Sequence, residues 1–260
     1  MSQQPKSQSL PHLWWCPTGP LAFLPIHAAG IYNEFGLPVQ HQCVSDYVIS
    51  SYTPTLSALL SPLPPQNDKS YMLAVIESST LPATRHELLK IRKCVPHEYL
   101  VALGTPESPV SASRVLEYLP NASVAHFACH GIQDITKPLN SSLILPGGNL
   151  KISEIMAKDL PNASLAFLSA CETAKGHQDL PDEVVHIAAS MLFAGFHSVV
   201  ATMWFVISLD HDAFLTDNFI GRSLMMMHQM LPIPSMVISL IMVLQSSLTQ
   251  RNLQRHYILQ

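Results

Sequence analysis

The chain has 260 residues, of which 48% are hydrophobic and 12% are charged, and its formal net charge is -4. This composition supports a buried core and excludes a wholly disordered chain. The small negative charge gives no electrostatic reason to expect binding to a phosphate backbone, so nucleic acid is not an expected partner.

The cysteines and the apolar runs indicate a cytoplasmic protein without a membrane segment. The five cysteines are an odd set with no paired spacing, and residues 1–13 lack the basic and then apolar pattern of a signal peptide. The most apolar run, Met236 to Leu244, is much shorter than the roughly 20 residues that a membrane helix needs. We therefore expect a reducing cytoplasm and no membrane partner.

The first part of the chain, residues 1–66, is the least regular. Trp14 to Cys16 predict a strand and Pro17 to Pro20 a turn. A second strand is expected over Val48 to Tyr52, followed by a helix over Thr55 to Leu60. Residues 61–70 are rich in proline and polar residues, so we predict a linker there.

The central part of the chain, residues 67–204, alternates short apolar runs with amphipathic stretches. This pattern is typical of a mostly parallel sheet flanked by helices, and the nearly continuous apolar runs predict strands buried on both faces. The predicted strands are Met72 to Ile76, Tyr99 to Leu103, Ser123 to Ala128, Leu165 to Ala170 and Ser198 to Met203. The predicted helices are Ala83 to Cys94, Ser111 to Leu119 and Asp182 to Ala194, the last capped by Asp182 and ended by Gly195.

An excursion from the main sheet is expected over residues 141–152. The segment SSLILPGGNLKI predicts two short strands around a Pro-Gly-Gly turn. Ser153 is then expected to cap a short helix. The two glycines lie in this hairpin, and no Gly-x-Gly-x-x-Gly loop follows any strand, so the sequence does not favour a nucleotide-binding domain.

Two predicted strands end in side chains that can perform nucleophilic chemistry. The segment VAHFACHG contains His130, and LAFLSACET contains Cys171. Because the carboxyl ends of parallel strands share one crevice, we expect these two side chains to face each other there. A thiolate can attack a carbonyl carbon while the imidazole moves the proton. The N–H groups of Gly131 and Cys171 are the expected donors to the oxyanion.

Other readings of the same residues predict core packing or a metal site. His126 is expected to be a hydrogen-bonded core histidine on the same strand and the same face as His130. Cys129 should point to the opposite face and behave as a small core hydrophobe. Because strand alternation separates His126 and His130 from Cys129, no tetrahedral zinc set converges, and we expect no metal.

Several long motifs, in this order along the chain, resemble the CHAT family, a caspase-like group related to separases. They are HFACHG, LILPGGNLKISEIM, LSACETAKG, LPDEVVHIAASMLFAGF and VVATMW. LWWCPTGPLAFLPIHAAG and SYTPTLSALL are similar to the same family nearer the start. The resemblance implies a caspase-like three-layer α/β fold with a mostly parallel central sheet, and a cysteine peptidase that needs no cofactor.

The same resemblance implies roles for individual residues and partners. His130 with Gly131 and the nucleophile Cys171 match the family's catalytic motifs, and Met203 and Trp204 fall where the substrate groove is expected. We expect Glu172 to meet a basic P1 side chain. The implied partners are a protein or peptide substrate and a helical-repeat sensor region on a longer parent protein.

Residues 205–260 form a tail without a family motif. Methionine has a single codon, and Leu224 to Met230, read in a frame starting two bases later, permits an acidic run such as the family shows after the tryptophan. We hypothesise that residues 205 to about 222 are translated intron-like sequence and that the remainder is out of frame. Loss of the last family elements is expected to expose Val199 to Met203 and to impair activity. The alternative is a catalytically inactive interaction module.

Overall fold

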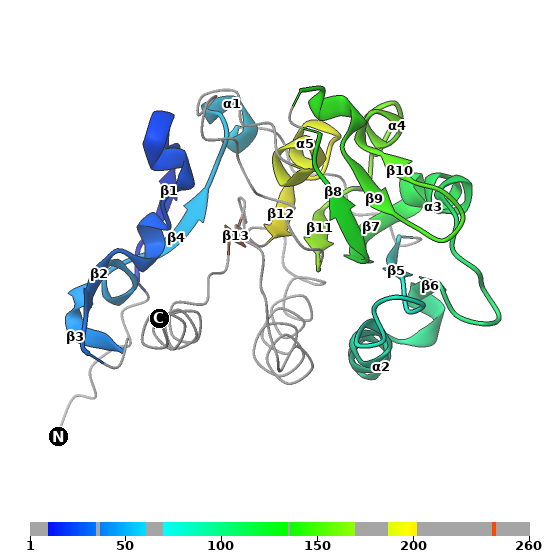
Figure 1. Ribbon diagram of the computed structural model, residues 1–260, viewed down its shortest axis with the longest axis horizontal. Helices are drawn as coiled ribbons and strands as arrows, with labels where there is room; N and C mark the ends of the chain where they lie inside the picture. Colours follow the sequence, from blue (N-terminus) through cyan, green and yellow to red (C-terminus); the bar gives the residue numbers. More distant parts are fainter. Residues whose placement is uncertain are drawn as a thin grey trace, which may run out of the picture.

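The computed structural model describes residues 10–34, 37–60, 70–134, 136–169, 187–201 and 241–242. Its centre is a parallel sheet with the strand order β6-β5-β7-β11-β12, and a short β13 pairs with β12 at one edge (Figure 1). The strands are β5 (Tyr71–Ile76), β6 (Leu100–Leu103), β7 (Ala122–Ala128), β11 (Leu165–Leu168), β12 (Ser198–Ala201) and β13 (Ile241–Met242). The five strands predicted from apolar runs are thus confirmed, except for residues 170, 202 and 203, which lie outside the described residues.

Helices cover both faces of this sheet, which confirms the predicted α/β fold. They are α2 (Thr84–Cys94), α3 (Ala112–Tyr118), α4 (Ile152–Met156) and α5 (Ile187–Phe193). Buried side chains of α2 share one core cluster with Met72, Ala74 and Ile76, whereas those of α3, α4 and α5 share another with Leu73 and Val75. Because successive strand residues point to opposite faces, these two clusters separate three layers.

The strand β12 is not an open edge. Val200 pairs with Ile241 and Ala201 pairs with Met242, and the described residues Val199 to Ala201 are at most 6% exposed. The expectation that the altered tail leaves this strand exposed is therefore wrong for Val199 to Ala201. The expected cap Asp182 lies outside the described residues, whereas Gly195 ends α5 with a φ of +116°, as predicted.

A second, antiparallel sheet follows β7. It consists of β8 (His130–Ile132), β9 (Ser142–Ile144) and β10 (Leu150–Lys151), and the turn between β9 and β10 contains the predicted Pro-Gly-Gly. Ser153 does not cap α4, because the helix already begins at Ile152, a fully buried residue. The backbone N–H of Lys151 instead donates to the Glu154 carboxylate at 2.9 Å, which closes the first turn.

The N-terminal part contains two pairs of strands. β1 (His12–Trp15) runs parallel to β4 (Ile49–Tyr52), and β2 (Gly30–Tyr32) is antiparallel to β3 (Pro38–Cys43). The helix α1 (Leu56–Leu59) begins after Thr55, whose hydroxyl accepts from the Ala58 N–H at 3.2 Å. Short 3-10 helices complete the described elements: η1 (Gly19–Phe23), η2 (Ile26–Ala28), η3 (Val44–Asp46), η4 (His97–Tyr99), η5 (Leu119–Asn121) and η6 (Pro138–Asn140).

The predicted strand at Trp14 and the predicted helix after Thr55 are confirmed, whereas the expected turn at Pro17 to Pro20 leads into η1. Most of the predicted linker, residues 61–69, lies outside the described residues. None of the described helices is long and apolar enough to cross a lipid bilayer.

Candidate active site

The site lies where three neighbouring parallel strands, β5, β7 and β11, reach their carboxyl ends. Phe127 near the end of β7 is opposite Leu168 at the end of β11. The backbone pairing continues past the strands, because Glu77 N–H donates to Ala128 O at 2.8 Å and Ser169 N–H donates to Phe127 O at 2.9 Å. Residues that follow these strands therefore gather at one edge of the sheet, where open α/β sheets bind ligands.

His130 lies at this edge, but not on the strand on which we expected it. β7 ends at Ala128, and His130 begins β8, where it is opposite Ile144 of β9. The expectation that His126 and His130 share one strand and one face is therefore wrong. Pairing with β9 turns the chain away from the parallel sheet, and the periodicity of the neighbouring residues does not reveal this change of partner.

Among the described residues, the His130 ring contacts the loop after β5. His130 is half-buried, and its Nε2 lies 3.1 Å from Thr80 Oγ1. The loop residues Ser79 and Thr80 in turn donate to the carboxylate of Glu77. One imidazole nitrogen is thus engaged by the protein while the side chain still reaches the surface, which is the arrangement that a general base requires.

Cys129, directly before His130, is confirmed as a core residue. It is 0% exposed and packs in the same cluster as Phe127. Burial raises the pKa of its thiol far above the ordinary value, and the negative charges of Glu77 and Glu87 raise it further. Because the thiolate is the reactive form, Cys129 is unsuited to act as a nucleophile.

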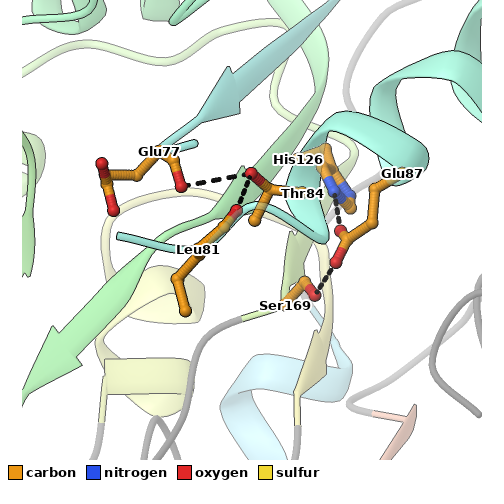
Figure 2. A network of polar contacts seen from close by, with 6 residues as sticks. All are labelled: Glu77, Leu81, Thr84, Glu87, His126 and Ser169. Atoms are coloured by element: carbon orange, nitrogen blue, oxygen red, sulfur yellow. Dashed lines mark hydrogen bonds and ion pairs between the residues drawn. The ribbon is translucent and has the colours of Figure 1, made fainter. Parts of the chain in front are cut away.

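His126 is confirmed as a hydrogen-bonded core histidine. It is 1% exposed, and its Nε2 lies 2.9 Å from Glu87 Oε2 in α2 (Figure 2). The other carboxylate oxygen of Glu87 accepts from Ser169 Oγ at 3.0 Å. The His126 ring also stacks on Phe167, with 5.0 Å between the ring centroids. These contacts join α2, β7 and the end of β11 beneath the site, as Figure 2 shows.

The roles of Glu87 and Ser169 were not predicted, although the sequence holds a signal for the first. Thr84, Glu87, Leu88 and Ile91 are the buried residues of α2, and their spacing follows one face of a helix. An acidic residue within such an apolar stripe indicates a buried carboxylate that needs partners. Ser169 carries no comparable signal, because serine is common at the ends of strands.

The predicted site is only partly within the described residues. Gly131 lies in β8 opposite Leu143, next to His130. Cys171, the predicted nucleophile and second oxyanion donor, lies outside the described residues, as do Glu172, Met203 and Trp204. The nearest described residue before Cys171 is Ser169, which Glu87 holds at the end of β11.

Comparison with known proteins identifies the family of this chain. A search of curated proteins gave no match. The family model described as the CHAT domain matches residues 1–217, most of the chain. The match includes β5, β7 and β11 and the segment from Glu77 to Ser169 that surrounds the site. The fold and this match together show that the chain belongs to the CHAT domain family.

Proposed function

We propose that this chain is a caspase-like cysteine peptidase domain that hydrolyses peptide bonds with Cys171 and His130. The observation that carries the proposal is the parallel pairing of β7 with β11, because His130 and Cys171 each follow one of these strands. Ser169 is held beside Phe127, and Cys171 follows it by two residues, a span of at most about 7 Å along the backbone. This short span supports the proposal that Cys171 acts together with His130.

The proposed reaction needs no cofactor. His130 takes the proton of Cys171, and the thiolate attacks the carbonyl carbon of the substrate. The N–H groups of Gly131 and Cys171 donate to the oxyanion. When the C–N bond breaks, the imidazolium gives its proton to the leaving amine. Water, deprotonated by His130, then hydrolyses the thioester and releases the acid and the free thiol.

Substrate recognition and regulation extend this proposal. Glu172 is proposed to contact a basic P1 side chain, and Met203 and Trp204 to line the groove for a protein or peptide substrate. A helical-repeat region on a longer parent protein is the proposed sensor. The predicted tail is residues 205–260, and the family match reaches residue 217. We propose that turnover in this form is impaired, because the last elements of a caspase-like fold would follow Trp204.

The first test is the reactivity of Cys171 in the chain of 260 residues. Iodoacetamide is added at neutral pH, and the alkylation of each cysteine is followed by mass spectrometry. Cys16 and Cys94 are exposed thiols that report ordinary reactivity, and we expect Cys171 to react about tenfold faster than either. His130→Ala should abolish this difference. His97→Ala, which removes an exposed imidazole, should leave it intact.

The second measurement separates a poised dyad from a working peptidase. A peptide library is incubated with the wild type and with Cys171→Ala, and cleavage that depends on Cys171 supports hydrolysis. Rapid alkylation of Cys171 without cleavage would indicate a dyad whose groove is impaired. Slow alkylation, equal to that of Cys16 and Cys94, would contradict the peptidase proposal and favour the interaction module.

A further inference from the structure

The loop between β5 and α2 contains a carboxylate that the proposed reaction does not use. Glu77 follows β5 directly and is 3% exposed. Its carboxylate accepts from the Ser79 N–H at 2.9 Å, from the Thr80 N–H at 3.3 Å and from the hydroxyl groups of both residues. Burial raises the pKa of Glu77, but these hydrogen bonds outweigh burial and leave the pKa below its ordinary value. Glu77 is therefore an anionic acceptor.

The hydrogen bonds of Thr80 determine the direction of its contact with His130. A hydroxyl group has one hydrogen, and an ionised carboxylate can only accept, so the Thr80 hydroxyl donates to Glu77. Thr80 Oγ1 then faces His130 Nε2 as an acceptor at 3.1 Å. Nε2 must therefore carry the hydrogen, and in a neutral imidazole this leaves the lone pair on Nδ1. A base needs that lone pair to take a proton from a thiol.

The topology of the sheet explains why these residues meet. The chain leaves the carboxyl end of β5 through α2 on one face of the sheet, and it leaves the carboxyl end of β7 through β9, β10 and α4 on the other face. The connections thus diverge between the adjacent carboxyl ends of β5 and β7, a topological switch point. Thr80 follows the first of these strands and His130 the second.

We propose that Thr80 is a positioning residue for His130, held by Glu77, and that it keeps the imidazole in the Nε2–H tautomer with Nδ1 as the base. This inference rests on the proposed peptidase function and deepens it. Glu77 holds the Thr80 hydroxyl, and Thr80 accepts from the ring. When His130 becomes protonated, its Nε2–H keeps the same acceptor, and the Glu77 charge lies one hydroxyl away.

The test compares three variants of the 260-residue chain by NMR of 15N-labelled histidine. Thr80→Val removes the hydroxyl with little change in shape, and Thr80→Ser retains it. Thr136→Val is the matched control, because the hydroxyl of exposed Thr136 donates to Asp134 at 2.8 Å. The chain has 13 histidines, so the His130 signals are assigned as those missing from His130→Gln. The spectra are recorded at a pH at which the imidazole is neutral.

In the wild type, we expect the Nε2–H tautomer of His130 and an Nε2–H proton signal protected by its hydrogen bond. Thr80→Val should lose the protected signal and admit a minor population of the Nδ1–H tautomer, whereas Thr80→Ser and Thr136→Val should retain the wild-type spectrum. Alkylation of Cys171 by iodoacetamide should fall about tenfold in Thr80→Val and recover in Thr80→Ser.

An Nδ1–H tautomer in the wild type would overturn the inference, and this result requires no variant to fold. A protected Nε2–H signal that persists in Thr80→Val would also overturn it. Failure of the peptidase proposal would look different. Cys171 would then react no faster than Cys16 in the wild type, while the tautomer of His130 would still respond to Thr80→Val.

Discussion

At the scale of single residues, Glu87 connects the polar groups buried beneath the site. Its two carboxylate oxygens accept from His126 in β7 and from Ser169 at the end of β11, and Glu87 itself is 2% exposed. A buried carboxylate is costly unless its oxygens are paired, and here each oxygen has a donor. The contacts therefore hold together three elements that converge on the site.

Replacement of Glu87 is predicted to destabilise the protein. Glu87→Ala leaves the His126 Nε2–H and the Ser169 hydroxyl without their acceptor, at a cost of about 1–3 kcal/mol for each unsatisfied group. We expect the free energy of unfolding, measured by urea denaturation, to fall by about 3 kcal/mol in total. Glu98→Ala, which removes an exposed carboxylate, should change it by less than about 0.5 kcal/mol. Equal losses in the two variants would show that the buried contacts contribute nothing.

At the scale of elements, the strands position the site by dividing their residues between two core clusters. Phe127 and Cys129 face the cluster of α3, α4 and α5. His126 stacks on Phe167, which packs in the cluster of α2. This alternation explains why His126 meets an acidic residue of α2, while Cys129 is enclosed by apolar side chains.

The close approach of β6 to β5 depends on Gly104. This residue has a φ of +99°, and a Cβ atom built on it would lie 1.8 Å from the carbonyl oxygen of Ile76. Gly104→Ala would therefore force β6 away from the end of β5, the segment that leads to Glu77 and Thr80. Backbone strain and steric overlap together are predicted to cost more than about 3 kcal/mol.

The control for this prediction is Gly148→Ala in the turn between β9 and β10. Gly148 has a φ of +114°, but a Cβ atom there meets nothing within 4 Å. In Gly148→Ala, the free energy of unfolding should fall only by the cost of the backbone conformation, about 1–2 kcal/mol. Urea midpoints of the two variants provide the comparison, and a loss no larger in Gly104→Ala than in Gly148→Ala would refute the argument from close approach.

At the scale of the whole molecule, the described residues of the proposed site lie where the parallel strands reach their carboxyl ends. β5, β7 and β11 are adjacent in space although other elements separate them in sequence. Glu77, His130 and Ser169 each follow one of these strands, and backbone hydrogen bonds join Glu77 to Ala128 and Ser169 to Phe127. The arrangement of the site therefore depends on strand order as well as on the sequence motifs.

The origin of the tail is a prediction at this same scale. If residues 205 to about 222 are translated intron-like sequence, a spliced transcript lacking their codons should exist. Sequencing of the transcript across the Trp204 codon tests this, and the spliced message should then read the acidic run that the shifted frame permits. One uninterrupted reading frame in related genomic copies would contradict the hypothesis. The pairing of Ile241 and Met242 with β12 is compatible with either origin.

Local pattern in the sequence determined the strands, the helices and the family. Nearly continuous apolar runs predict strands buried on both faces, so β5, β7, β11 and β12 were expected close to where they lie. The order of several motifs indicated the CHAT family, which the match to residues 1–217 confirms. The core role of Cys129 also followed from local alternation, and that of His126 from its position before the end of the strand.

Only the tertiary structure decided which distant side chains meet. Thr80 and His130 are 50 residues apart, and Glu87 and Ser169 are 82 apart. Their contacts depend on the order of the strands and on which helix covers each face of the sheet. The periodicity of the sequence predicts neither. The departure of His130 from β7 has the same cause, since β9, and not the residues beside His130, supplies its new partner. Periodicity is a property of neighbouring residues, whereas the site arises from packing between segments far apart in the chain.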